Sequence, residues 1–249
     1  MRHCLVILLA VFSLGRIAPC QTADELVAKN IEAKGGMDKI LAIQTIRETG
    51  RFSQQGFNAD VAQENKRPNL VRETFAVQGM TAVQAYDGST GWQIQPFGGK
   101  KDPQLMGDDD MRDLLIDSDI DGPLMNYKQK GNVVEYLGHD TVDGDDALRL
   151  KVTLKNGDII YYYLDPDTYL EIRTETQEFI RGSVRESTKD LGAYKQVAGV
   201  YFPFSLASGP KSDPSQWQHI TIEKIEVNVP LESSEFAVPA SLKNEAAKK

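Results

Sequence analysis

The stretch ALRLKVTLKNGDIIYYYL, residues 147–164, decides the expected fold class of this chain. Up to Leu154, leucine and valine alternate with arginine, lysine and threonine, so an extended strand has one apolar face and one polar face. Asn156-Gly157 follows, and an Asn-Gly pair between two β-rich runs is typical of a hairpin whose turn holds both residues at positive φ. The pattern predicts an antiparallel hairpin with one buried face.

The same alternation extends through most of the chain. Arg181-Gly182 and Ala198-Gly199 supply turns between strands, and consecutive strands joined by short loops favour an antiparallel meander over βαβ units. A register break is expected near Lys224, where the apolar positions of the last strand change phase. The predicted strands are residues 45–54, 58–66, 70–78, 81–86, 91–95, 147–154, 159–164, 168–180, 183–195, 200–207 and 216–229.

The first twenty residues have the pattern of a secretory signal peptide. Arg2 provides a basic start, residues 4–14 are apolar, and a small-residue cleavage context ends at Cys20. Two routes stay open at Cys20: cleavage after it releases a soluble chain, which the preceding Pro19 favours, and lipidation of Cys20 leaves a membrane-anchored lipoprotein. We therefore expect an exported, periplasmic protein in which residues 21–249 form a single domain.

Composition excludes several classes of protein. Without Arg2 and Arg16, 26 of the 28 basic side chains remain against 36 acidic ones, a formal charge of −10, so nucleic acid is not an expected partner. No run after residue 20 approaches the roughly eighteen apolar residues of a membrane helix. Cys4 belongs to the signal, so Cys20 has no partner and no disulfide is expected.

Helices are expected at the start of the mature chain and in its middle. Thr22 and Glu25 form a capping box that predicts a helix ending at Gly35-Gly36, and residues 37–43 predict a second, short helix. Between residues 103 and 127 apolar residues recur at spacings of three and four, which predicts one or two amphipathic helices. Two interpretations stay open: these helices cap the open face of the sheet, or they form a lid over a cavity for an apolar ligand.

The sequence offers no local motif for catalysis, a metal or a cofactor. Asp117, Asp119 and Asp121 copy the first half of a calcium-binding loop, but the position that requires a bidentate Glu is occupied by Lys128. His139 and His219 have no Cys, His or Glu at ligand spacing, and no nucleotide-binding or serine-hydrolase motif occurs. We expect no catalytic residue, no metal and no cofactor, with an unrecognised hydrolase as the remote alternative.

Several phrases together resemble the LolA/LolB-like periplasmic lipoprotein-carrier superfamily, and more closely its outer-membrane lipoprotein-sorting proteins. Residues 23–52 resemble the first helix, double glycine and first strand of that group, and YDGSTGWQIQPFGG (residues 86–99) resembles its Asp-Gly turn and strand tryptophan. LDPDTYLEIRTE (residues 164–175), AYKQVAGVYFPFSL (193–206) and VNVPLESSEFAVP (227–239) resemble its later strands and terminal segment.

The resemblance implies a mainly β (α+β) fold: a strongly curved antiparallel sheet that forms an unclosed barrel, with helices covering the concave face. It also implies an apolar cavity that shelters lipid or lipoprotein acyl chains, so that the function is non-enzymatic binding or transport, with lipoprotein sorting to the outer membrane and contact with envelope membrane proteins as finer roles. The alternative is an envelope scaffold of the same fold whose interior is plugged by its own side chains.

Two sets of residues are candidates for this function. In carriers of this kind an arginine near the cavity helps to hold the lid, and Arg47, Arg51 and Arg72 are the strand candidates, with none assigned. The candidate lipid-binding residues are Trp92, Leu105, Met106, Met111, Leu114, Leu115, Leu124 and Met125.

Overall fold

The computed structural model describes residues 21–246. The predicted signal peptide and Cys20 lie outside the described residues, and so does the choice between release and lipidation at Cys20. None of the helices in the described part of the chain is long and apolar enough to cross a membrane.

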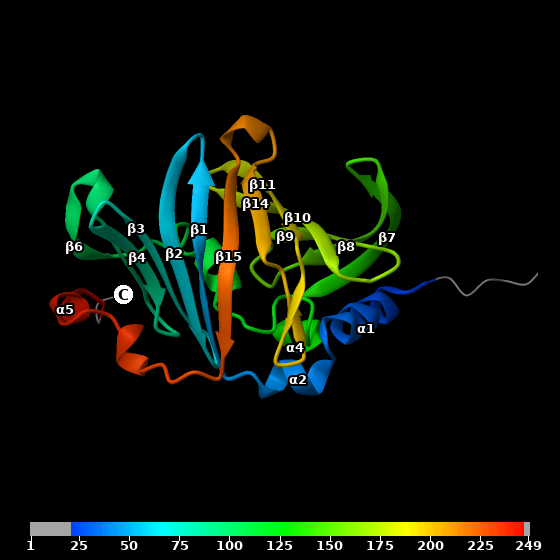
Figure 1. Cartoon of the computed structure of the whole chain (residues 1–249), viewed down its shortest axis with the longest axis horizontal. Helices are drawn as coiled ribbons and strands as arrows, with labels where there is room; N and C mark the ends of the chain where they lie inside the picture. The colour runs from blue at the N-terminus through cyan, green and yellow to red at the C-terminus, as the bar shows by residue number, and fades with distance from the viewer. Residues whose placement is uncertain (1–20, 247–249) are drawn as a thin grey trace, which may run out of the picture.

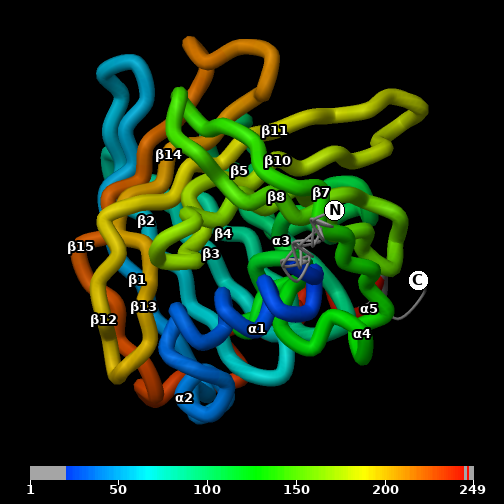
Figure 2. The backbone as a smooth tube through the Cα atoms, turned by 90° about the vertical axis from the view of Figure 1, so that its right-hand side faces the viewer, coloured from blue at the N-terminus to red at the C-terminus, as the bar shows by residue number. Residues whose placement is uncertain are grey.

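Most of the strands form one large antiparallel sheet that curves strongly and does not close into a barrel (Figures 1 and 2). The predicted fold class, mainly β with an unclosed barrel, is confirmed. The sheet has thirteen strands in the order β6-β5-β4-β3-β2-β1-β15-β14-β11-β10-β9-β8-β7. Their bounds are β1 Thr45–Gln54, β2 Phe57–Lys66, β3 Leu70–Val77, β4 Met80–Tyr86, β5 Gly91–Gln95, β6 Lys100–Leu105, β7 Val133–Val142, β8 Asp145–Thr153, β9 Ile159–Leu164, β10 Glu171–Ile180, β11 Ser183–Gly192, β14 Ser205–Pro210 and β15 Gln218–Val227.

The sheet consists of two meanders that meet in the middle. Strands β1 to β6 run from the centre to one edge, and β7 to β11 return from the other edge, so β6 and β7 lie far apart (Figure 1). The last strand, β15, pairs with the first, β1, and joins the two halves. The chain must therefore cross from one edge to the other between residues 106 and 132.

The helices are few and short. Helix α1 (Ala23–Lys34) begins with the predicted capping box, in which the Thr22 hydroxyl accepts from the Glu25 amide at 3.2 Å and the Glu25 carboxylate accepts from the Thr22 amide at 2.9 Å. Helix α2 (Met37–Ala42) follows the double glycine as predicted. The remaining helices are α3 (Arg112–Asp117), α4 (Tyr127–Lys130), α5 (Lys243–Ala246) and the short 3₁₀ turns η1 (Pro96–Gly98), η2 (Pro214–Gln216), η3 (Ser233–Glu235) and η4 (Ala240–Leu242).

The turns are partly as predicted. Arg181 and Gly182 have φ of 50° and 83°, which matches a two-residue turn with both central residues at positive φ between β10 and β11. The hairpin at Asn156-Gly157 is present, but only Gly157, at φ 93°, has positive φ. Our prediction of that turn type was wrong, because the Asn156 side chain instead accepts a hydrogen bond from the Asp158 amide at 3.1 Å.

Four segments differ from the sequence-based prediction. The run 183–195 ends at Gly192, and β12 (Lys195–Val197) pairs with β13 (Val200–Phe202) in a separate two-stranded sheet. The amphipathic region 103–127 contains the short helix α3 and only the first residue of α4, because Gly107, Gly122 and Pro123 interrupt it. Strands β6 and β7 were missed: both are edge strands, and β6 contains Pro103, which an edge position tolerates.

The pairing of β1 with β15 contains the predicted register break. The register shifts between Thr49 and Gly50, opposite Lys224 and Ile222, so Glu223 is the extra residue of a β-bulge. A Cβ atom at Gly50 would lie 2.3 Å from the Thr221 carbonyl oxygen and 3.1 Å from the Ile222 Cα. The absence of a side chain at Gly50 therefore allows β15 to approach β1.

The substitution Gly50→Ala tests this close approach. Because the methyl group must displace the β15 backbone, we expect the free energy of unfolding to fall by about 1–3 kcal/mol in urea denaturation. Gly192→Ala is the control, since a Cβ there meets nothing within 4 Å, and it should change stability by less than about 0.5 kcal/mol. Equal midpoints for the two variants would contradict the proposed role of Gly50.

Candidate binding cavity

A cavity of about 630 Å³ lies between the concave face of the sheet and residues 106–126, which we call the crossover segment. Figure 2 shows the strands curving around α1 and α3. The volume falls within the roughly 300–1,000 Å³ typical of small-molecule sites. The interior of the sheet is therefore not filled by its own side chains.

One end of the cavity is apolar. Its lining there comes from α2, β1, β13 and the crossover segment, and it is continuous with a core cluster that contains Ile222, Ile225 and Met125. The apolar lining residues at this end are Ile40, Ile43, Ile46, Ile120, Val200 and Phe202. Such a surface suits an aliphatic chain.

The wall formed by β1 to β6 is polar. The strand registers place glutamate or glutamine side by side on six successive strands, on the face where Glu48 and Gln63 line the cavity. We call this set the Glu/Gln row: Glu48, Gln63, Glu73, Gln84, Gln93 and Gln104. The concave face is therefore apolar on some strands only.

The two carboxyls of the Glu/Gln row are strongly perturbed. Burial raises the pKa of Glu48 to about 7, and Asp117 raises it further while Lys189 opposes the shift. Burial likewise raises the pKa of Glu73 to about 8, again with contributions from Asp117 and Asp113. Near neutral pH these carboxyls therefore carry only part of their negative charge.

Lys189 of β11 faces these acids from the opposite wall. Its Nζ lies 3.9 Å from Asp117 Oδ1, and the negative charge of Asp117 is the main reason that its pKa is raised. Its side chain keeps 46% of its surface accessible although protein surrounds it, because the cavity leaves space around it. Lys189 thus projects into the hollow.

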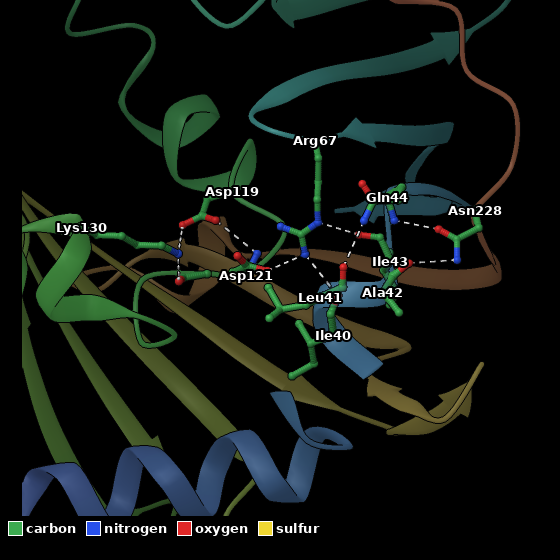
Figure 3. Close-up of polar contacts among 11 residues, drawn as sticks. Ile40, Leu41, Ala42, Ile43, Gln44, Arg67, Asp119, Asp121, Lys130 and Asn228 are labelled. Atoms are coloured by element: carbon green, nitrogen blue, oxygen red, sulfur yellow. Dashed lines mark hydrogen bonds and ion pairs between the residues drawn. The ribbon is translucent and has the colours of Figure 1, made fainter. Parts of the chain in front are cut away.

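Arg67, in the loop after β2, ties the crossover segment to α2 (Figure 3). Its guanidinium donates to Asp121 Oδ1 at 2.5 Å, to the Ile43 carbonyl at 2.6 Å and to the Ile40 carbonyl at 3.1 Å. Only 18% of the Arg67 side chain and 12% of the Asp121 side chain are exposed, so the pair is shielded from water. Arg67 therefore links α2 to the crossover segment, and residues of both line the apolar end of the cavity.

Further polar contacts hold the crossover segment at other points. Asn65 donates to the Asp117 carbonyl at 2.6 Å, and Lys130 pairs with Asp119 (Figure 3). Arg185 binds Asp113 at 2.8 Å, and Arg112 binds the buried Asp158 at 2.7 Å.

The three aspartates that resemble a calcium loop, Asp117, Asp119 and Asp121, contact different partners: Lys189, Lys130 and Arg67. Among residues 21–246 no group of three or more His, Cys, Asp or Glu is arranged to hold a metal ion.

Most of the predicted lipid-binding residues of the crossover segment pack into the core and attach the segment to the sheet. Met106 and Leu114 are buried with Val71, and Met111 packs against them. Met125 is buried in the cluster around Ile222, whereas Leu115 is 39% exposed. Leu124 is the one predicted residue that lines the cavity.

Trp92 and Leu105 lie on the other face of the sheet. Both belong to a cluster with Val238 and Leu242, and the Trp92 indole donates to the Phe236 carbonyl at 2.9 Å. The C-terminal segment therefore covers these residues on the convex side, away from the cavity.

The remaining candidates also lie outside the cavity. Arg47 and Arg72 both pair with Glu64 on the convex face, and Arg51 pairs with Asp60, so none of the three arginines holds the crossover segment. His139 contacts Asp146 at an exposed position, and His219 is an exposed residue of β15.

Sequence reasoning missed Arg67, Lys189, Glu48 and Glu73. Arg67 precedes Pro68, a context typical of a turn, and its partners are far away in sequence. Glu48 has polar neighbours on both sides in the sequence, so alternation could not assign it to the inner face. Only the register of β1, β2 and β3 places these two glutamates on one face, on either side of Gln63.

Comparisons with known proteins support the fold. No family model matches the chain, and no curated protein matches it in sequence. Among solved structures, a LolA superfamily protein from Nitrosomonas europaea matches with a TM-score of 0.60 and 9% identity over 88% of this chain and 99% of that chain. A DUF1329 family protein from Desulfovibrio piger matches with a TM-score of 0.60 and 14% identity over 86% of this chain and 97% of that chain.

A third match is a putative outer membrane lipoprotein-sorting protein domain from Vibrio parahaemolyticus, with a TM-score of 0.56 and 13% identity over 90% of this chain and 99% of that chain. The chain therefore has a LolA-like fold, as its sequence resemblance implies. At these identities the likeness establishes the fold alone.

The substitution Arg67→Ala should loosen the crossover segment. It leaves the shielded Asp121 carboxylate without its partner, so amides of residues 119–122 should exchange hydrogen about tenfold faster or more, as measured by mass spectrometry. Arg72→Ala is the matched control, because Arg72 pairs with Glu64 on the convex face. Unchanged hydrogen exchange in Arg67→Ala would contradict the role of Arg67 in holding the crossover segment.

The perturbed glutamates predict a pH-dependent stability. Because their pKa values are raised on folding, they lower the free energy of unfolding increasingly as pH rises from about 4.5 to about 8. Above about pH 8 this free energy falls no further. Glu73→Gln should therefore raise the free energy of unfolding at pH 9 by on the order of 2–4 kcal/mol and leave it unchanged at pH 4. Glu135→Gln on the exposed edge should show no such difference between the two pH values in urea denaturation.

Proposed function

We propose that this protein binds lipids, or the acyl chains of lipoproteins, in the cavity beneath the crossover segment. The role is non-enzymatic, and its setting is the periplasm after export. Lipoprotein sorting to the outer membrane, with delivery through envelope membrane proteins, is the finer role that we propose. The observation that carries the proposal is the cavity of about 630 Å³ with an apolar end.

The energetics of acyl-chain burial suit this cavity. Each buried methylene contributes about 0.8 kcal/mol, so a single long chain supplies most of the binding free energy without specific polar contacts. The apolar end between α2 and the crossover segment provides the surface that such a chain needs. The envelope-scaffold alternative requires an interior plugged by side chains, which a cavity of this size does not favour.

The way the crossover segment is held also supports uptake of a ligand. Its ends are anchored by buried apolar residues, Met106 and Met125, whereas the part over the cavity is held by ion pairs and hydrogen bonds such as Arg67 to Asp121. Polar bonds exchange with water at lower cost than a packed core opens. The segment can therefore lift over the cavity while the core stays packed.

Filling the cavity tests the function. Thr174 of β10 lines the cavity, and Thr153 of β8 is equally half-buried on the opposite face of the sheet. Thr174→Trp should weaken binding of a fluorescent fatty-acid probe by about tenfold or more, because the indole takes the volume of several methylenes. Thr153→Trp should bind the probe like the unmodified protein.

Mass spectrometry of organic extracts provides a second measurement. Lipid should co-purify with the unmodified protein and be depleted in Thr174→Trp. A protein that carries no lipid after purification and binds no acyl probe would overturn the proposed function.

A further inference from the structure

Glu48 and Glu73 have no partner that explains their position. Among residues 21–246 neither carboxylate forms a hydrogen bond or an ion pair within 4 Å, although both side chains are half-buried. Glu48 lines the cavity, and Glu73 lies beside it, separated by Gln63 in the Glu/Gln row. An enclosed carboxylate without a partner is costly, so its place beside a cavity indicates a ligand group that completes it.

Around Glu48 and Glu73, carboxyl groups outnumber the positively charged side chains. The groups that face Glu48 and Glu73 are Asp113 and Asp117 of α3 and Lys189 of β11, and the intervening residue of β2 is the neutral Gln63. Arg185 also lies nearby on β11, but it is bound by Asp113 and Glu178. Lys34 also lines the cavity, but it pairs with Glu171 at 3.2 Å. Among the described residues, Lys189 is therefore the cation left for Glu48, Glu73 and Asp117.

We propose that the cavity binds a cationic amphiphile, an amine carried on an aliphatic chain, with the amine facing Glu48, Glu73 and Asp117 and the chain in the isoleucine-lined end. This inference rests on the proposed function, because it names the class of lipid that the same cavity takes. An amine supplies the positive charge and the hydrogen-bond donors that the carboxyls lack. A fatty-acid carboxylate would instead add a further negative charge to the same wall.

The geometry fixes the orientation of such a ligand. The Glu/Gln row lies along β1 to β6, and Ile46 of β1 is only two residues from Glu48 on the same face. The polar and apolar parts of the lining therefore adjoin within one cavity. An amphiphile with its head at Glu48 can place its chain directly against Ile46, Ile43 and Ile40.

The perturbed carboxyls give the proposal a pH signature. At pH 6 Glu48 and Glu73 are mostly protonated, and at pH 8.5 they are mostly ionised, whereas an alkylamine keeps its charge over this range. Binding of the amine should therefore strengthen as pH rises and release protons from the two carboxyls. Binding of a neutral amphiphile should not follow this trend.

Isothermal titration calorimetry of delipidated protein tests the inference with three probes of one chain length: dodecylammonium, dodecanol and dodecanoate, each below its micellar concentration. We expect dodecylammonium to bind about tenfold tighter than dodecanol at pH 8.5, with dodecanoate weakest, and the preference for the amine to shrink at pH 6. Heats measured in two buffers of different ionisation enthalpy should reveal proton release with the amine alone.

Variants separate the charge of the wall from its shape. The double variant Glu48→Gln, Glu73→Gln should reduce the ratio of amine to alcohol affinity to about one, because the amides keep the shape and remove the charge. Lys189→Gln should change the ratio in the other direction, since it removes the competing cation. Glu226→Gln, on the convex face opposite Arg47, is the control and should keep the ratio of the unmodified protein.

Each outcome distinguishes the two proposals. Equal affinity for amine and alcohol, or tighter binding of dodecanoate, would overturn the cationic head group and leave acyl-chain binding intact. A preference for the amine that survives in the double variant would also overturn it. Binding of none of the three probes would overturn the proposed function as well.

Discussion

The pairing of β1 with β15 is the interaction on which the rest of the structure depends. It joins the first strand of one meander to the last strand of the other, and the bulge opposite Gly50 sets its register. Because the two meanders meet at the centre, their free edges, β6 and β7, lie at opposite ends of the sheet. The connection between them must then cross the sheet, and the curvature of the sheet directs that connection over the hollow side.

The strand order of the sheet therefore requires the crossover segment, independently of any role in ligand binding. Its apolar side chains bind it to the core near its two ends, through Met106 and Leu114 on one side and Leu124 and Met125 on the other. Over the cavity Ile116 and Ile120 are only partly buried, and polar bonds from Arg67 and Asn65 add to their contacts. A connection that is fully packed near its ends and partly polar in its middle leaves a space below that a ligand can occupy.

Local patterns predicted local structure, and the site depends on non-local structure. The capping box at Thr22, the hairpin at Gly157 and the register break near Lys224 were visible because each involves neighbouring residues. The methionines of the crossover segment were recognised as apolar and were predicted to bind ligand, but their spacing reflects separate anchors and only a six-residue helix. The partners of Arg67 lie in α2 and the crossover segment, and the members of the Glu/Gln row lie on different strands, so no single stretch of sequence contains either arrangement.

The polar wall adds a head-group requirement to the proposed binding of an acyl chain. A cavity for hydrocarbon alone needs no ionisable group, and enclosed carboxyls reduce stability unless a positive charge meets them. Lys189 meets Asp117 from across the hollow, yet Glu48 and Glu73 lie on the wall where Lys189 is their single countercharge within the described residues. Because the charged row and the isoleucines adjoin on β1, the cavity distinguishes the two ends of a ligand. In the proposed function the cavity therefore selects by head group as well as by chain, and the sign of its charge disfavours anionic lipids.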